Sequence, residues 1–232
     1  MSRLTVFKYA LLRNIRTPLL FMATSLGPIV IIFLMVDIWT YAPAAGVGML
    51  AMLMMYSLNT SAGIILEDRM DGSVIRVATS PVSTLSYITQ NLFAVILPTF
   101  LQILLLGIAG YVRYNWSMEL TLGMTLSLLL FAVANTAFAF TWNMFFKSKE
   151  GSKWTFLFVV MLIAFFGGLV IPTEFLPNIL QHVGAIVHPY WLMRSVTSLE
   201  SDGITMTFWL YQLVLILFAT GYLVIGGTRK MN

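Results

Sequence analysis

The chain has 232 residues, of which 59% are hydrophobic and 9% are charged, with a formal net charge of +4. An ordinary soluble domain carries about 25% charged residues, and a soluble fold of this length has too little interior to bury so many apolar side chains. We therefore exclude a soluble enzyme, a disordered regulator and a secreted disulfide scaffold. We expect lipid to surround most of the chain, and the small positive charge does not indicate a nucleic-acid partner.

Motifs for nucleotide and metal chemistry are absent from the sequence. It has no cysteine, which excludes disulfides, thiolate metal sites and cysteine nucleophiles. No glycine-rich loop ends in Gly-Lys-Ser or Gly-Lys-Thr, so the chain has no P-loop for ATP phosphates. Its two histidines, His182 and His188, belong to no His-Glu-x-x-His motif. We expect them, with Glu174, to cap short helices or meet lipid head groups, and we predict no metal site and no catalytic residue.

Six apolar segments are long enough to cross a bilayer as helices, which need roughly 20 residues. The first exceeds the about 7–15 apolar residues of a signal-peptide core, so we expect an uncleaved span. An all-α, polytopic membrane protein is therefore the predicted fold class. The six predicted transmembrane helices cover residues 18–36, 44–66, 83–112, 118–146, 154–171 and 207–225.

Lysine and arginine alternate strongly between the two sides of these six spans. Eleven fall on the side of the N-terminus and two on the other side, Arg113 and Arg194. Because cytoplasmic loops carry the excess of basic residues, we predict that both termini are cytoplasmic. The eleven are Arg3, Lys8, Arg13, Arg16, Arg69, Arg76, Lys147, Lys149, Lys153, Arg229 and Lys230.

Residues 2–17 have the pattern of an amphipathic helix that lies in the membrane interface. Leu4, Phe7, Leu11 and Ile15 recur at helical spacing, and the basic residues lie on the remaining surface. Such a helix places its cations toward lipid phosphates. We predict an N-terminal elbow helix, with a simple orientation signal as the alternative.

The connection over residues 67–81 has more internal organisation than the other loops on the basic side. Asp71 or Ser73 can cap a short helix. Ser80 can cap the next helix with Pro81 at its first position, where a missing N–H costs nothing. We predict a short helix parallel to the membrane surface, able to dock into a groove on a soluble partner. A plain interfacial loop is the alternative.

Residues 172–199 are too apolar for a solvated loop, yet Pro172, Pro177 and Pro189 interrupt them. We predict short re-entrant helices that dip into the outer leaflet between spans five and six. Non-helical backbone at that depth must be covered by protein or water.

The order of these features resembles the permeases of type-2 ATP-binding-cassette (ABC) exporters. In that family the connection after span two reads Glu, charged residues, Gly-Ser or Gly-Thr, an apolar-basic run and Ser-Pro. The matching residues here are Glu67, Asp71-Gly72-Ser73, Ile75-Arg76 and Ser80-Pro81. A second match, in the return segment, consists of Gly167-Gly168, Pro172, Leu176-Pro177, Pro189 and Arg194. With the six-span layout and the elbow helix, the resemblance covers essentially the whole chain.

The resemblance implies one transmembrane permease domain over residues 1–232, paired with a second permease as a homodimer or heterodimer. Two copies of a separate ATPase subunit would bind ATP and Mg, while this chain binds no cofactor and is not an enzyme. The complex would export a drug, an antimicrobial peptide or a lipid across a cell membrane, bacterial by expectation. In the family, residues 67–81 form the coupling helix in a cleft of the ATPase. The expected coupling residues are Glu67, Asp71, Gly72, Ser73, Ile75, Arg76, Ser80 and Pro81.

Few charged groups fall deep in the predicted spans, which disfavours proton coupling. Uncharged polar residues such as Asn135 and Gln212 can form helix–helix hydrogen bonds, worth about 0.6 kcal/mol each on average. Methionine adapts to irregular apolar surfaces, and in the family spans two and five face the translocation path. We hypothesise that a hydrophobic cargo contacts Met52, Met55, Asn59 and Phe165, with packing or lipid contact as the alternative.

Two other classes of function stay open at this stage. A secondary transporter or channel without an ATPase partner would need ion-coupling residues or rings of polar side chains along a pore. An integral-membrane enzyme or assembly factor would need a cluster of catalytic polar residues at one depth. The sequence shows neither pattern.

Overall fold

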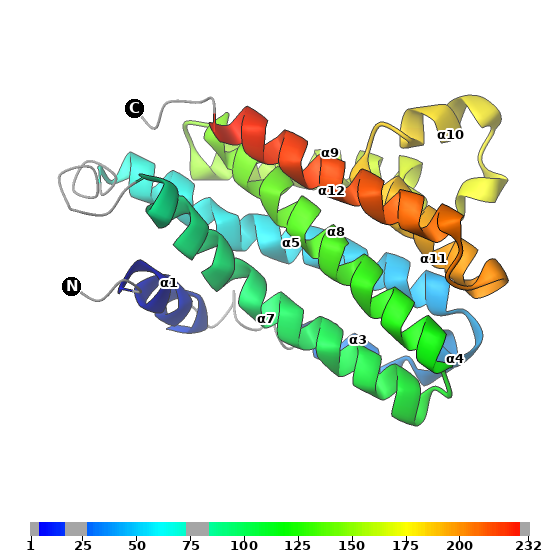
Figure 1. Ribbon diagram of the computed structural model, residues 1–232. Helices are drawn as coiled ribbons and strands as arrows, with labels where there is room; N and C mark the ends of the chain where they lie inside the picture. Colours follow the sequence, from blue (N-terminus) through cyan, green and yellow to red (C-terminus); the bar gives the residue numbers. More distant parts are fainter. Residues whose placement is uncertain (1–4, 17–26, 73–83, 228–232) are drawn as a thin grey trace.

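The computed structural model describes residues 5–16, 27–72 and 84–227, and the regular structure within these ranges is entirely helical. Four long helices lie side by side and form the body of the molecule (Figure 1). They are α5 (Pro43–Met70), α7 (Thr84–Arg113), α8 (Met118–Met144) and α12 (Met206–Gly227). Helix α8 is central, since it packs against α5, α7 and α12.

Four segments of these helices are long and apolar enough to span a membrane: Pro43–Met70, Gln90–Arg113, Met118–Met144 and Met206–Gly226. The shortest has 21 residues, which at 1.5 Å per residue matches a hydrocarbon core of about 30 Å. The prediction of an all-helical membrane protein is therefore confirmed for four candidate spans. The predicted helix ends are also close, since α8 begins at Met118 and α12 lies within two residues of the prediction.

The first and fifth predicted spans are not among these four. Residues 18–26 of the first lie outside the described ranges, and its described remainder consists of α3 (Gly27–Leu34), Met35 and the first residue of α4 (Val36–Tyr41). The fifth corresponds to α9 (Lys149–Phe166), which begins and ends five residues earlier than predicted. Because three of its 18 residues, Lys149, Glu150 and Lys153, are charged, its apolar part falls short of a full span by composition.

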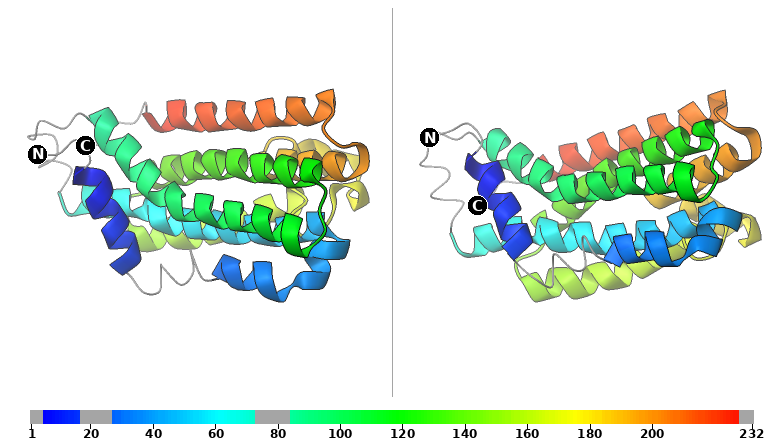
Figure 2. Two further views of the ribbon diagram at one scale, coloured as in Figure 1. Left: turned by 60° about the horizontal axis from the view of Figure 1, so that its bottom comes forward. Right: turned by 90° about the horizontal axis from the view of Figure 1, so that it is seen from below.

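The two ends of the helix bundle differ in charge. Figure 2 shows α1 (Thr5–Arg16) at the same end as the C-terminus of α5, the start of α7 and the last turns of α12. We call this the basic end, because the helix termini and the loop that form it carry Lys8, Arg13, Arg69, Lys147, Lys149 and Lys153. At the other end lie α4, α11 (His188–Asp202) and α10 (Asn178–Gly184), preceded by the short helix η2 (Thr173–Phe175).

An aromatic cluster closes the end opposite the basic end. Trp39 is fully buried and donates from its indole N–H to the carbonyl of Ile31 at 3.2 Å. Trp116 donates to the carbonyl of Trp39 at 2.9 Å, and Tyr114 donates to the carbonyl of Ile32. These rings fix α3 and α4 against the turn between α7 and α8. Tryptophan and tyrosine commonly occupy the membrane–water boundary, where an apolar ring with a polar group is favoured.

Local sequence signals explain several helix ends. Ser117 accepts a hydrogen bond from the Leu120 N–H at 3.1 Å and caps α8, and Ser148 accepts from the Gly151 N–H at 3.2 Å and caps α9. Pro43 begins α5, and the next N–H, of Ala44, donates to the carboxylate of Glu200 in α11 at 2.8 Å. A carboxylate here also interacts favourably with the positive end of the helix dipole.

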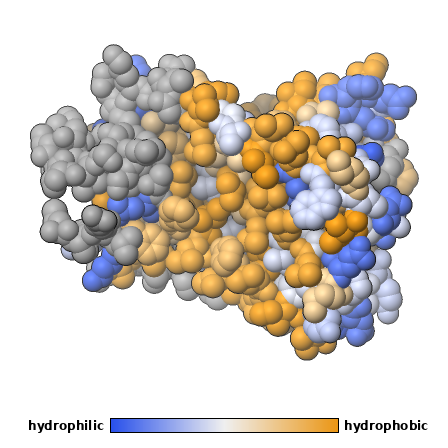
Figure 3. Space-filling view, viewed as in Figure 1, coloured by the Kyte–Doolittle hydropathy of each residue, from blue (hydrophilic) through white to orange (hydrophobic). Residues whose placement is uncertain are grey.

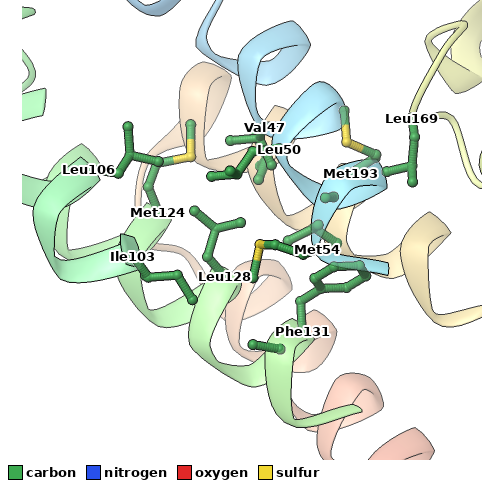
Figure 4. Packing of buried hydrophobic residues seen from close by; sticks show 14 of the residues in the cluster. Val47, Leu50, Met54, Ile103, Leu106, Met124, Leu128, Phe131, Leu169 and Met193 are labelled. Atoms are coloured by element: carbon green, nitrogen blue, oxygen red, sulfur yellow. The ribbon is translucent and has the colours of Figure 1, made fainter. Parts of the chain in front are cut away.

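The core is apolar and lies where α5, α7 and α8 meet. Figure 4 shows Val47, Leu50 and Met54 of α5 beside Leu128 and Phe131 of α8. The apolar surface continues outside: Figure 3 shows apolar residues across the middle of the face on which α7 and α8 lie in front. A surface of this kind is unfavourable in water and favourable in hydrocarbon.

Buried polar side chains bond to one another between helices. Gln212 of α12 donates to Ser127 of α8 at 2.9 Å and to Ser195 of α11 at 2.6 Å. Asn135 of α8 donates to the carbonyl of Met54 in α5 at 3.2 Å. The polar residues singled out at Asn135 and Gln212 therefore join helices in this structure.

Close packing at Gly48 gives a testable prediction. A Cβ at Gly48 would collide with the backbone carbonyl of Leu169, whereas a Cβ at Gly221 of α12 would meet nothing within 4 Å. We expect Gly48→Ala to lower the free energy of unfolding by about 1–3 kcal/mol. Thermal unfolding of the purified protein in detergent is the measurement. Gly221→Ala is the matched control and should be neutral or stabilising, so equal effects of the two substitutions would contradict this packing.

Candidate functional site

Three consecutive charged residues at the C-terminal end of α5 reach three different helices. Glu67 forms an ion pair with Lys149 of α9. Asp68 accepts from Arg13 of α1, with Nη1–Oδ1 at 2.9 Å and Nη2–Oδ2 at 3.4 Å. Arg69 donates from Nη1 to the carbonyl of Met144, the last residue of α8, at 3.3 Å. We call Arg13, Glu67, Asp68, Arg69 and Lys149 the charged cluster.

The geometry of an α-helix explains why neighbouring residues reach separate partners. Successive side chains are about 100° apart around the axis, because 3.6 residues make one turn. Glu67, Asp68 and Arg69 therefore point toward α9, α1 and α8 in turn. The side chains of Asp68 and Glu67 are 18% and 33% exposed, and those of Arg13 and Lys149 are 39% and 51% exposed. The carboxylates are thus partly enclosed, while their cationic partners face outward.

A polar node lies deeper in the bundle beneath the charged cluster. Asn143 of α8 donates to Oδ1 of Asn59 in α5 at 3.0 Å and to the carbonyl of Ala139 at 2.8 Å. Its own Oδ1 accepts from the hydroxyl of Ser152 in α9 at 2.8 Å. All three side chains of the node, Asn59, Asn143 and Ser152, are buried. The node joins α5, α8 and α9, so displacement of the α5 terminus would also pull on the other two helices.

Helix α5 is longer than the sequence predicted. The predicted span ended at residue 66, but α5 continues through Glu67, Asp68 and Arg69 to Met70. The charged side chains allow this because their ion pairs and the bond to Met144 hold the last turn against neighbouring helices. The first four residues of the predicted connection over 67–81 are therefore helical.

The helix then ends at two of the expected coupling residues. The Asp71 N–H donates to the carbonyl of Glu67 at 2.9 Å, and the Gly72 N–H donates to the carbonyl of Arg69 at 3.3 Å. Gly72 has a φ of 68°, the left-handed conformation with which glycine often ends a helix. Five of the eight expected coupling residues lie outside the described residues: Ser73, Ile75, Arg76, Ser80 and Pro81. The coupling role of all eight stays a prediction.

The four candidate cargo residues occupy different environments. Met55 is fully buried in the core, and Asn59 belongs to the polar node. Met52 is partly buried and packs against the core, while Phe165 of α9 is 37% exposed. Helices α5 and α9 do pack together. Within a single protomer, only Met52 and Phe165 of the four present side-chain surface to the outside.

The histidines of the return segment lie in separate surroundings. His188 is fully buried and packs against aromatic rings, with its centroid 5.3 Å from that of Phe131, and its Nδ1 lies 3.3 Å from the hydroxyl of Tyr222. His182 Nδ1 lies 2.6 Å from the carbonyl of Asn178, one turn earlier in α10. Among the described residues, no three His, Cys, Asp or Glu side chains are grouped so that they could hold a metal ion.

Sequence reasoning missed most of this arrangement. It gave site roles to Glu67 and Asn59, but none to the other six residues: Arg13, Asp68, Arg69, Lys149, Asn143 and Ser152. One signal was available: an acidic pair at the end of an apolar run faces basic residues in two other predicted segments on the same side. No such signal exists for Asn143, because a neutral amide in an apolar run does not indicate which residue it pairs with, here Asn59.

Comparison with known proteins identifies the family of this chain. Residues 38–227 match the family model described as ABC-2 family transporter protein, which covers more than half of the chain. The matched range includes all four candidate spans and the connection after α5. A search of curated protein sequences finds no match.

The polar node can be tested by a double-mutant cycle. Asn143→Leu leaves the carbonyl oxygen of Asn59 without its donor, and we expect it to lower stability by about 0.6–1.7 kcal/mol. Asn59→Leu/Asn143→Leu should cost less than the sum of the single substitutions, because neither partner is then left unpaired. Thermal unfolding in detergent measures both effects. Strict additivity would show that the two amides do not interact.

Proposed function

We propose that this chain, which belongs to the ABC-2 transporter family, is the permease subunit of an ATP-driven exporter. The observation that carries the proposal is the charged cluster. It ties the end of α5 to α1, α8 and α9 at the start of the connection over residues 67–81, in which the coupling helix is expected. Force applied to that connection would act on several helices at once rather than on one loop.

In this proposal residues 67–81 receive movement from the ATPase. Glu67 and Asp71 would join the contact to α5. The residues that would contact a cleft of that subunit are Gly72, Ser73, Ile75, Arg76, Ser80 and Pro81. Helix α5 has 28 residues, so at 1.5 Å per residue it would carry a displacement about 40 Å from the basic end to the opposite end. The continuous helix and its bonded terminus support this role.

The proposed topology has six spans and places the basic end in the cytoplasm, with both termini there. The distribution of basic residues supports this topology, because the sequence assigns eleven lysines and arginines to this side and two to the other. Helix α1 would then be the elbow helix at the inner surface. Helices α10 and α11 would lie in the outer leaflet as the re-entrant pair.

The complete transporter would contain two copies of an ATPase and two permease subunits, identical or different, in a bacterial cell membrane. ATP and Mg would bind to the ATPase, because this sequence has no P-loop. The cargo would be hydrophobic or amphipathic. Met52 and Phe165 are the candidate contacts with the most accessible surface, and Met55 and Asn59 would act from the interior of the protomer.

Co-purification tests the partnership directly. Tagged full-length protein, extracted from its native membrane, should bring down a P-loop ATPase. Arg76→Glu and Gly72→Pro should each reduce the amount of ATPase recovered while the permease stays in the membrane. Arg113→Glu, an exposed arginine at the end of α7, is the matched control and should have no effect.

Normal recovery with both coupling variants would contradict the coupling assignment. Absence of any ATPase would favour a secondary transporter or channel.

The ion pair between Glu67 and Lys149 predicts a charge-reversal result. Glu67→Lys places two ammonium groups together, and we expect it to reduce permease-dependent stimulation of the ATPase. Partly exposed ion pairs contribute about 0.2–1 kcal/mol, so a loss of up to about fivefold is expected. Glu67→Lys/Lys149→Glu restores opposite charges and should recover the stimulation.

Reversal at Lys153, which is exposed on α9, is the control. Lys153→Glu changes the net charge by the same magnitude as Lys149→Glu, with the same sign, and should leave the stimulation unchanged. Failure of the double reversal to recover activity would show that the ion pair itself is not required.

A further inference from the structure

An apolar groove opens on the surface between α7 and α8. It has a volume of about 610 Å³, within the about 300–1,000 Å³ typical of small-molecule pockets. Along α7 it is lined by Gln90, Phe93, Leu97 and Phe100, whose three- and four-residue spacings place them on one helix face. Phe93 and Phe100 are 65% and 40% exposed, so the groove faces the surroundings of the protein and not its core.

The α8 side makes the groove concave. Ala132 is buried and contributes only a methyl group, while Leu129 and Val133 lie one turn apart on either side of it. The short alanine side chain leaves space between α7 and α8. Gln90 carries the one polar side chain among the described residues that line the groove.

The length of the groove matches one leaflet of a bilayer. Its α7 lining extends over eleven residues, from Gln90 to Phe100, and the ten steps between them at 1.5 Å each amount to about 15 Å. Half of the hydrocarbon core of a bilayer is also about 15 Å. The groove begins near the start of α7, at the basic end, and therefore reaches from that membrane surface toward the midplane.

Helix α1 supplies a polar boundary at the end of the groove. Phe7 of α1 lines the groove, and its backbone N–H donates to the side-chain oxygen of Gln90 at 3.1 Å. The next residue, Lys8, is exposed. An apolar channel bordered by a helix that carries an exposed lysine has the polarity of a phospholipid, whose acyl chains are apolar and whose phosphate is anionic.

We propose that this groove binds one acyl chain of a phospholipid in the leaflet on the side of α1, with the lipid phosphate near Lys8. The bound chain fills the space above Ala132 and holds α1 against α7. The lipid site requires that α7 and α8 lie in the membrane, and it does not require the ATPase. An experiment can therefore contradict lipid binding without contradicting the proposed export function, and the reverse.

Photocrosslinking tests the site in the full-length protein. The protein is reconstituted in vesicles of phosphatidylcholine and phosphatidylglycerol, either of which carries a diazirine in the middle of its acyl chain. After illumination, labelled residues are identified by mass spectrometry. We expect labels to concentrate on Leu97, Phe100, Leu129 and Val133, above the level on the exposed apolar face of α12. Even labelling of both faces would overturn the proposal.

Matched substitutions sharpen the result. Val133→Trp fills the groove and should reduce its labelling to the level on α12, whereas Val224→Trp, at an exposed valine of α12, should not. Lys8→Glu should lower labelling by phosphatidylglycerol relative to phosphatidylcholine by about fivefold, and Lys153→Glu on α9 should not. Unchanged labelling in Val133→Trp, or unchanged lipid preference in Lys8→Glu, counts against the site.

The same reconstituted protein can distinguish the proposed lipid from two other occupants of the groove, a second copy of this chain and the cargo. The native chain has no cysteine, so Phe93→Cys can be tested for disulfide-linked dimers in the membrane, which would show that a second copy covers the groove. Displacement of the label by a compound that stimulates the ATPase would show that cargo occupies it. Either result would overturn the proposal of a resident lipid.

Discussion

Hydrocarbon offers no hydrogen-bond partners, so a polar group inside this helical bundle is stabilised only by partners within the protein. The backbone finds them by forming long helices. Side-chain donors find them by pairing across helices, as the Gln212 amide N–H does with Ser127 and Ser195, whereas the buried oxygens Gln212 Oε1 and Asn135 Oδ1 accept no hydrogen bond in this structure. Each such pair also fixes which helices are neighbours, because hydrophobic contact discriminates weakly between protein and lipid. In α5, α8, α9, α11 and α12 these few bonds add to the close packing of one shared apolar core.

Helix α5 connects the two ends of the molecule. At one end its first free N–H group is capped by Glu200 of α11. In its middle Asn59 bonds to Asn143, and at the basic end the charged cluster joins it to α1, α8 and α9. A helix fixed at three levels moves with its neighbours as a unit. This property suits an element that would carry movement from a docked ATPase into a membrane domain.

The long helices could be predicted from sequence because their signal is local. Hydropathy alone placed α8 and α12 within two residues of their observed ends. The end of α5 was predicted too early, because the stabilising partners of Glu67 and Asp68 lie in other helices. The Asn59–Asn143 bond was not predictable, since a neutral amide in an apolar run carries no information about its partner. The groove above Ala132 likewise depends on which residues of α7 and α8 face each other, and the periodicity of a single helix does not show this.

The proposed function requires contact between the end of α5 and a nucleotide-hydrolysing subunit, and a single cross-link can detect that contact. A single cysteine introduced as Asp71→Cys in the otherwise cysteine-free chain can be joined to nearby proteins by a short thiol-reactive cross-linker in native membranes. We predict a product that contains a P-loop ATPase and whose yield changes when ATP is added. Labelling of the same cysteine by a membrane-impermeant reagent applied outside intact cells would contradict the account.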